Sequence, residues 1–255
     1  PKAAIMLAIC MHASLQNARA VTFTDVTALS GINYVQNQIN PLILTLPQSI
    51  AGGAAAADYD GDGEMEVVAS SWIKGNRFAY FDRQDGGWIM SIIDENVNDT
   101  RMVSAVDVNG NGRPDLVGTA TLDDMFLWYE NPGDPSNRPW KLHIIDTAPR
   151  PHHGHPVDMD GDGGVDLVMA IRGDTSEKLA LETPGSQIAW YEQAAGGSWT
   201  KHVIAEEFHQ ASEAVSADID GDGEMEVIAT AWGLEGRVAI FKHRGDPRGP
   251  WDMQI

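Results

Sequence analysis

The sequence has almost no cysteine and few cations. Its one cysteine, Cys10, lies in the first apolar segment, so an intrachain disulfide framework is excluded. Lys and Arg together number 17 against 37 Asp and Glu, which gives a net charge of -20 at pH 7. A surplus of this sign argues against nucleic acid or an anionic membrane surface as a partner and favours cations.

Long apolar runs and helical periodicity are also missing. Beyond the first twenty residues no apolar run is long enough to cross a bilayer, so no membrane span is expected. The sequence instead consists of short β-branched and aromatic stretches bounded by Gly, Asn, Asp and Pro, which is typical of β-strands. With 255 residues, 43% of them hydrophobic, the chain can still bury a core.

The first twenty residues have the pattern of a secretory signal peptide. Lys2 precedes the short apolar run from Ala3 to Cys10, and Ala18-Arg19-Ala20 matches an A-x-A cleavage site. A buried N-terminal helix is the alternative. We therefore expect a signal peptide over residues 1–20, a secreted, periplasmic or extracellular protein, and a source of stability other than disulfides.

One acidic, glycine-containing motif occurs four times. It reads "DYDGDGEME" from Asp58, "DVNGNGRPD" from Asp107, "DMDGDGGVD" from Asp158 and "DIDGDGEME" from Asp218. The copies start 49, 51 and 60 residues apart (58 to 107, 107 to 158, 158 to 218), within the range of propeller repeats.

Each copy sits in a similar set of strand-like segments. A small-residue stretch precedes the loop; an apolar stretch, an aromatic stretch and a Trp-led stretch follow it, as in "VVASSW", "RFAYFD" and "WIMSIID". Four antiparallel strands per unit predict an all-β β-propeller, with blades at about 51–98, 99–148, 149–207 and 208–255. Residues 21–50 lack the motif and are expected to form an N-terminal strand or partial blade.

The number of blades is a separate question. The last copy stops at Ile255 within its final strand, where the other copies continue. We therefore expect about four blades that are the N-terminal part of a larger propeller, for example one of seven blades. A closed four-bladed ring is the alternative.

The repeated loops have the donors that Ca²⁺ prefers. Carboxylates at loop positions 1, 3, 5 and 9 can point at one centre because glycines at positions 4 and 6 allow a sharp turn, while position 7 offers its carbonyl. Such hard oxygen donors suit Ca²⁺ rather than Zn²⁺. The predicted ligands are Asp58, Asp60, Asp62, Glu64 and Glu66; Asp107, Asn109, Asn111, Arg113 and Asp115; Asp158, Asp160, Asp162, Gly164 and Asp166; and Asp218, Asp220, Asp222, Glu224 and Glu226.

Two other interpretations of the loops are weaker. An EF-hand would need a glutamate at position 12, which is Ala69 in the first loop and is not Glu in any other. Plain polar turns would leave crowded carboxylates without counter-ions. The second loop, with Asn109 and Asn111, should bind calcium more weakly than the others because it has fewer charges.

These loops and strands resemble the FG-GAP/VCBS repeats of integrin α-subunit propellers and of many secreted microbial proteins. The resemblance covers roughly residues 51–255, and "FTDVTALSGI" at 23–32 is similar to the lead-in of bacterial members. It implies a seven-bladed or similar propeller with calcium between the first two strands of its blades. It implies no single activity, because the family includes adhesion modules, polysaccharide lyases and sugar dehydratases.

A candidate ligand site is expected on the face opposite the loops. Trp72, Arg172 and Trp232 follow the second strand of their units, and other side chains precede the first strand: Arg101, His152, His153, His155 and His209. Trp stacks on sugar rings, Arg neutralises carboxylates and His transfers protons near neutral pH. Alternatively, the histidines are satisfied turn residues; a zinc site formed by His152, His153 and His155 is not favoured, because their spacing guarantees no common direction.

Two functions are therefore expected. The first is a calcium-binding module for carbohydrate or an extracellular protein. The second is a polysaccharide lyase or sugar dehydratase in which Arg101 or Arg172 neutralises a uronate while His153 or His209 abstracts a proton.

Overall fold

The computed structural model describes residues 52–72, 75–84, 87–136, 138–174, 183–232 and 236–254. The predicted signal peptide over residues 1–20 and the predicted strand or partial blade over residues 21–50 lie outside these ranges. The described residues contain β-strands, the short 3-10 turn η2 (Thr121–Asp123) and no α-helix. None of the described segments forms a helix with the length and apolar surface that a bilayer crossing requires.

The strands form four sheets, each of four antiparallel strands in chain order, and this confirms the predicted all-β unit. Sheet 1 contains β1 (Ala54–Ala57), β2 (Glu66–Ser71), β3 (Arg77–Gln84) and β4 (Gly87–Asp94). Sheet 2 contains β5 (Thr100–Val106), β6 (Asp115–Ala120), β7 (Met125–Glu130) and β8 (Lys141–Thr147). Sheet 3 contains β9 (Pro151–Val157), β10 (Asp166–Ile171), β11 (Gln187–Gln193) and β12 (Trp199–Glu206). Sheet 4 contains β13 (Ala211–Ala217), β14 (Glu226–Ala231), β15 (Arg237–His243) and β16 (Trp251–Gln254).

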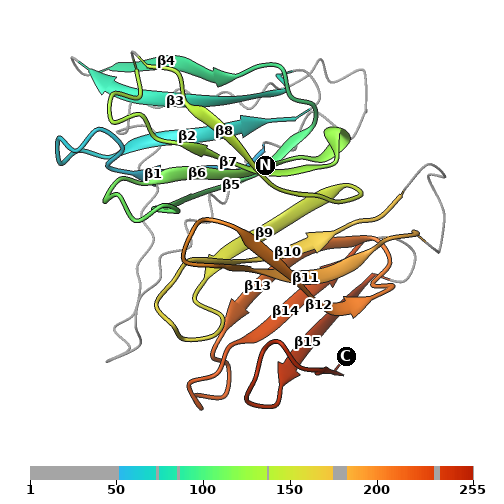
Figure 1. Ribbon diagram of the computed structural model, residues 1–255. Coiled ribbons are helices and arrows are strands. Elements are labelled where there is room, and N and C mark those ends of the chain that lie inside the picture. Colours follow the sequence, from blue (N-terminus) through green and yellow to red (C-terminus); the bar gives the residue numbers. More distant parts are fainter. Residues whose placement is uncertain are drawn as a thin grey trace, which may run out of the picture.

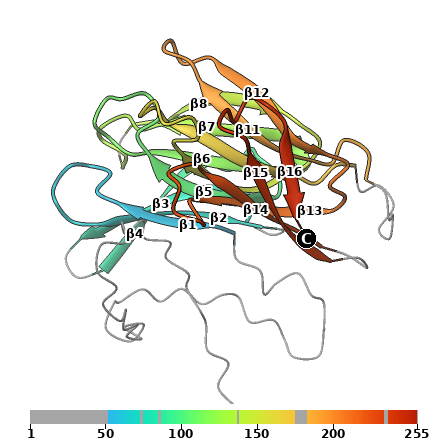
Figure 2. The ribbon, with the colours of Figure 1, turned by 90° about the horizontal axis from the view of Figure 1, so that it is seen from below.

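The sheets follow one another in space as they do along the chain. The first strands lie at the contacts between neighbouring sheets: β5 lies beside β1, β2 and β9, and β13 lies beside β9 and β10. Figure 1 shows this succession from the top of the view to the bottom, and Figure 2 shows it from below. The arrangement is that of β-propeller-like blades; ring closure and a larger total number of blades stay predictions.

Three hydrophobic cores hold the four sheets together, one at each contact between neighbours. Val68, Phe78 and Tyr80 of sheet 1 pack with Leu116 and Tyr129 of sheet 2. The other two cores are built in the same way from equivalent repeat positions: Val117, Phe126 and Trp128 against Leu167 and Tyr191, and Val168, Ile188 and Trp190 against Val227 and Phe241.

The strand period of two explains this pattern. Neighbouring residues point to opposite faces, so Leu116 faces sheet 1 while Val117 faces sheet 3. Strands β6 and β10 are accordingly buried at every residue, since sheets 2 and 3 have a neighbour on both faces. In β2 and β14 burial is not continuous, because sheets 1 and 4 have a described neighbour on one face only.

Hydroxyl groups add a second link between neighbouring sheets. The Oγ of Ser70 donates to the carbonyl of Arg101 at 3.2 Å, and the equivalent Oγ1 of Thr119 donates to the carbonyl of His152 at 2.9 Å. Each bond joins the second strand of one sheet to the first strand of the next. The equivalent residue of sheet 3 is Ala170, which has no hydroxyl, so apolar packing alone acts at that position.

Repeat-equivalent residues provide a direct test of the inter-sheet cores. Ile188 of sheet 3 is fully buried, whereas Val238, at the same repeat position in sheet 4, is 58% exposed. We expect Ile188→Ala to reduce the free energy of unfolding by about 2–5 kcal/mol, because it leaves a cavity, and Val238→Ala to change it by less than about 0.5 kcal/mol. Urea denaturation of both variants measures the difference; equal losses would contradict this assignment of the core.

Candidate functional site

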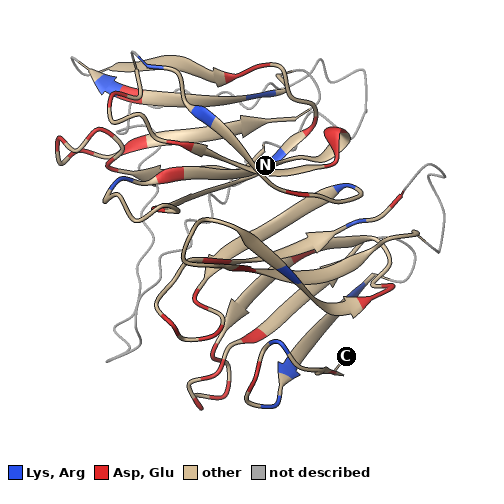
Figure 3. Cartoon of the chain, viewed as in Figure 1, with Lys and Arg blue, Asp and Glu red and all other residues tan. Residues whose placement is uncertain are grey.

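The four acidic loops all connect the first and second strands of their sheets. They join β1 to β2, β5 to β6, β9 to β10 and β13 to β14, and so lie at the same end of each sheet. Figure 3 shows acidic residues recurring in loops at the left and lower left of the view. The topology therefore repeats one polar structure four times along a single side of the molecule.

Two glycines in each loop adopt the left-handed backbone that the motif predicts. In the first loop Gly61 has a φ of 82° and Gly63 a φ of 89°, and the corresponding pairs in the other loops are also positive. Other residues rarely adopt such angles. The turn brings two amide groups onto the side chain of Asp58, whose Oδ1 accepts from Gly61 N at 2.7 Å and whose Oδ2 accepts from Gly63 N at 3.1 Å.

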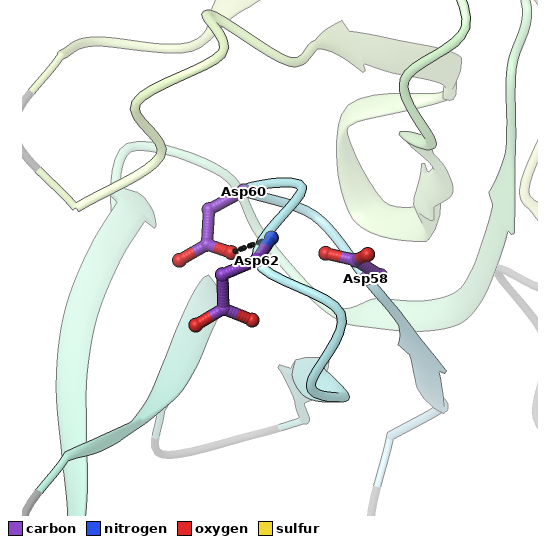
Figure 4. Close-up of side chains that lie close together, drawn as sticks. All are labelled: Asp58, Asp60 and Asp62. Atoms are coloured by element: carbon purple, nitrogen blue, oxygen red, sulfur yellow. Dashed lines mark hydrogen bonds between the residues drawn. The ribbon is translucent and has the colours of Figure 1, made fainter.

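The same hydrogen bonds recur in the other loops. The aspartate at position 1 accepts from the glycine at position 6 in all four copies, at 2.7–3.1 Å. The residue at position 5 accepts from the amide two residues later, also in all four; in the first loop Asp62 accepts from Glu64 N at 2.8 Å. Figure 4 shows Asp58, Asp60 and Asp62 side by side on this turn, with the bond from Asp62 N to Asp60 Oδ1.

The acid at position 9 anchors each loop to its sheet. Glu66, Asp115, Asp166 and Glu226 are all at most 3% exposed. One carboxylate oxygen of each accepts from the amide at position 2, as in the 2.7 Å bond from Tyr59 N to Glu66 Oε2. Burial, with a smaller contribution from nearby carboxylates, raises the pKa of Glu66 to about 7 and those of Asp115 and Asp166 to about 6. Keeping such a cluster of carboxylates ionised costs free energy unless a cation lies nearby.

Three loops bring three acids into reach of one ion. Their oxygens lie within 4.8 Å of one another in the sets Asp58, Asp60 and Asp62; Asp158, Asp160 and Asp166; and Asp218, Asp220 and Glu226. The donors are all hard oxygens; in the fourth loop the Oε1 of buried Glu226 accepts no hydrogen bond but lies 3.5 Å from Lys242 Nζ. This donor set fits Ca²⁺. The second loop, with Asn109 and Asn111, adds neutral amide oxygens to Asp107 and Asp115.

The opposite ends of the same strands carry a network centred on Arg101. Its guanidinium carbon lies 4.1 Å from the ring centroid of Trp72. Its Nη2 forms an ion pair with Asp99 Oδ2 at 2.9 Å, and its Nη1 lies 2.8 Å from His152 Nε2. The Nδ1 of His152 lies 2.8 Å from the carbonyl of Ser212. Equivalent positions of sheets 2, 3 and 4 are thereby linked in a chain.

Arg101 also determines the protonation of the neighbouring histidines. Because a guanidinium can only donate, His152 Nε2 must accept and His152 Nδ1 carries the proton. His153 Nδ1, 2.6 Å from His152 Nδ1, is then the acceptor of that pair. Burial lowers the pKa of His152 well below its ordinary value and that of His153 to about 4, and the charge of Arg101 adds to both shifts. Both rings are therefore neutral at pH 7.

A second arginine lies beside a second tryptophan. Arg172 donates from Nε and Nη2 to the amide oxygen of Gln210 at 3.2 and 3.1 Å, and its guanidinium carbon lies 5.2 Å from the ring centroid of Trp232. Burial lowers the pKa of Arg172, and the positive charges of Arg101 and Arg150 lower it further. Trp232 is 66% exposed whereas Arg172 is partly buried, so the tryptophan is the solvent-facing member of this pair.

The remaining predicted residues lie near these pairs. His209 Nδ1 accepts from Thr183 N at 3.2 Å, and His155 Nε2 lies 4.0 Å from Glu213 Oε1. Burial raises the pKa of Glu213 to about 7. Sequence reasoning did not find Asp99 or Gln210, which contact the two arginines. Both residues directly precede the first strand of their sheet, β5 and β13, and this shared repeat position was the available signal.

One detail of the prediction was wrong. Arg101, His152, His153 and His155 do not precede the first strand of their sheets but lie within β5 and β9. These strands continue through irregular pairing, in which Arg101 and His152 fall between the paired residues. Such bulges re-aim side chains, and their local pairing is invisible to a period-two pattern.

Comparison with known proteins bears on the repeat. Residues 107–169 match the family model described as "FG-GAP-like repeat". The predicted FG-GAP resemblance is confirmed. The match runs from the second acidic loop to the second strand of sheet 3. No curated protein sequence matches the chain.

A solved structure is also similar. The V. cholerae biofilm matrix protein Bap1 matches with a TM-score of 0.42 and 15% sequence identity. The alignment covers 77% of this chain and 38% of the Bap1 chain, so the chain spans well under half of that structure.

The neutral histidines predict a pH dependence of stability. The pKa of His153 is about 4 in the folded state, below its ordinary value of 6.5. The neutral imidazole therefore contributes fully to the free energy of unfolding above pH 6.5, and this contribution is lost as the pH falls toward 4. We expect His153→Gln to reduce the loss of unfolding free energy between pH 7.5 and pH 5 by about 1–2 kcal/mol. Urea denaturation at both pH values tests this, with His143→Gln on β8 as the control; an unchanged pH dependence would contradict it.

Proposed function

We propose that this protein is a secreted, calcium-stabilised β-propeller module that binds an acidic polysaccharide on the face opposite its acidic loops. The FG-GAP-like repeat and the four blade-like sheets support the general class of a binding module. The observation that carries the ligand class is the pair of Arg172 and Trp232, in which a cation lies beside a largely exposed indole ring.

The chemistry of this pair suits a uronate. An exposed indole offers a flat apolar surface on which the C–H face of a sugar ring can lie, and a guanidinium matches the two oxygens of a carboxylate. Arg101 already has Asp99 as its ion-pair partner, whereas Arg172 hydrogen-bonds a neutral amide. Arg172 feels the positive charges of Arg101 and Arg150 and the smaller opposing effect of Asp99, so the local excess of positive charge would attract an added carboxylate. Arg172 is therefore the proposed anion contact, and Trp72 and His155 stay proposed ligand residues on the same face. His152 is 5% exposed and both of its ring nitrogens have protein partners, so its proposed role is to support Arg101.

Binding to uronate polymers tests the proposal. We expect the protein to bind polygalacturonate or alginate oligosaccharides in calorimetric titrations, and Arg172→Ala or Trp232→Ala to weaken binding about tenfold or more. Dextran, which lacks carboxylates, is the ligand control. Arg244→Ala, at an exposed arginine paired with Asp252 in sheet 4, is the protein control. Equal affinity of all variants for uronates, or no binding across a panel of uronates, would reject this site. Binding of the chain to an extracellular protein but to no uronate would favour a protein partner.

Calcium is proposed as the ion of the acidic loops. The ligands would be the acids at positions 1, 3, 5 and 9, with Asn109 and Asn111 in the second loop, and the carbonyls of Glu64, Arg113, Gly164 and Glu224. Bound calcium would neutralise crowded carboxylates and fix each loop against its buried ninth residue. In a chain whose one cysteine cannot form an intrachain disulfide, these ions would stabilise the fold in place of cross-links.

Thermal unfolding measures this contribution. Calcium at about 100 times its dissociation constant should stabilise the folded state by about 2.7 kcal/mol per site, because it binds the folded loops preferentially. We expect a calcium chelator to lower the melting temperature and added Ca²⁺ to restore it. Equal concentrations of Mg²⁺, which demands a smaller octahedral site, serve as the control. A melting temperature indifferent to chelator would remove calcium from the proposal.

A lyase or dehydratase is the second candidate, and one observation favours it. Glu213, with its pKa raised to about 7, lies 4.0 Å from His155, and His153 and His209 lie on the same face. An acid near neutrality beside imidazoles can transfer protons. Incubation with uronate polysaccharides should then release unsaturated products that absorb in the ultraviolet. If the protein binds polysaccharides of the same panel without releasing such products, the lyase or dehydratase is rejected and the binding module is retained.

A further inference from the structure

One repeat position beside the acidic loops changes the sign of its charge in sheet 4. The residue that follows the last aromatic of the third strand is Asp82 in sheet 1, Glu130 in sheet 2 and Glu192 in sheet 3, but Lys242 in sheet 4. The pairing of the second and third strands fixes this equivalence, since Phe81, Tyr129, Tyr191 and Phe241 all pair with the first apolar residue after the ninth loop position.

Lys242 reaches the fourth loop with its charged group. Its Nζ contacts Asp220, lies 2.9 Å from Asp222 Oδ2 and lies 3.5 Å from Glu226 Oε1. These three acids occupy positions 3, 5 and 9, which are the positions proposed to hold the metal. The ammonium therefore already contacts the same oxygens that a calcium ion would need.

In the other three sheets the residue equivalent to Lys242 is an acid, so it adds a charge of the opposite sign beside the loop. In sheets 1 and 2 the equivalent residues, Asp82 and Glu130, are acids and add negative charge at this repeat position. In the third, Glu192 pairs with Arg248, whose guanidinium also contacts Asp160. Lys242 thus places a cation of its own sheet on the acids of the fourth loop, whereas in sheet 3 the acid at this position pairs with Arg248, which contacts Asp160 alone among the third loop's acids.

We infer that Lys242 closes the fourth loop as an internal cation, so that this loop binds calcium about tenfold or more weakly than the first. The inference rests on the proposed role of calcium. The two loops have the same sequence except at position 2, where Tyr59 is replaced by Ile219, so loop composition alone would give them equal affinity. Calcium entering the fourth loop must displace the ammonium from three carboxylates or share them with a like charge.

Exchanging the charges between sheets 1 and 4 tests the inference. Calcium binding to the full chain, stripped of metal, is measured by calorimetric titration, with terbium luminescence as a second readout. We expect Lys242→Glu, which gives sheet 4 an acid at the position where sheets 1 to 3 have one, to add one tight calcium site. We expect the reciprocal change Asp82→Lys to remove one. Lys242→Met, which removes the charge without adding an acid, should give an intermediate gain in affinity.

Substitutions within the loops locate the sites. Asp218→Asn should leave the number of tight sites of the wild-type protein unchanged but abolish the site gained with Lys242→Glu, whereas Asp58→Asn should remove one tight site from the wild type. If Asp218→Asn removes a tight site from the wild type, the inference is wrong. If neither Asp58→Asn nor Asp218→Asn changes any binding, because the wild type binds no calcium, the proposed role of calcium itself fails. Circular dichroism of each variant shows whether it is folded.

Discussion

The burial of one carboxylate per sheet is the constraint on which the rest of the structure depends. The acid at loop position 9 begins the second strand, is almost completely buried, and ties the loop to the sheet through the amide at position 2. A charge buried in this way must be compensated by hydrogen bonds and by a nearby cation. In sheets 2 and 3 the second carboxylate oxygen accepts at the end of the third strand, from Asn131 N directly after β7 and from Gln193 N in β11. The loop, the second strand and the third strand are thereby fixed together at one residue.

Because the acids are anchored at one end of each sheet, the two ends of a sheet carry side chains of different charge. The acids concentrate in the loops between first and second strands. At the opposite ends of the strands, Arg101 and His152 lie where β5 and β9 begin and Arg172 follows the end of β10. A chain with a strong negative net charge can therefore still present a cationic and aromatic surface, because the opposite charges lie at the other end of the strands. Ions in the loops would weaken the field of the acids at that surface as well as stabilise the fold.

The sequence predicted the fold well because its signal was repeated. Four copies of a nine-residue loop set the register, and the register correctly placed the strands of each sheet and the end at which the loops lie. The network around Arg101 could not be predicted in the same way. It depends on bulges in β5 and β9, on the ion pair with Asp99 and on hydrogen bonds to His152 that cross between sheets, none of which follows from a period-two pattern. The positive charge of Lys242 can be seen when the four repeats are aligned. Its contact with the acids of the loop could be inferred only from the structure, in which the third strand runs beside the loop.

Stability and recognition thus depend on different kinds of repeat position. Where the copies agree, as in Val68, Val117 and Val168, the residues are buried between sheets and any change must preserve volume. They differ strongly in chemistry at one strand end, where the position that follows the second strand holds Trp72, Thr121, Arg172 and Trp232. Thr121 uses its hydroxyl to bind the carbonyl of Pro151, whereas the Trp and Arg at the same position form the two cation–aromatic pairs. A symmetric scaffold can bind an asymmetric ligand only through such departures, so the proposed site lies where the repeat is least regular.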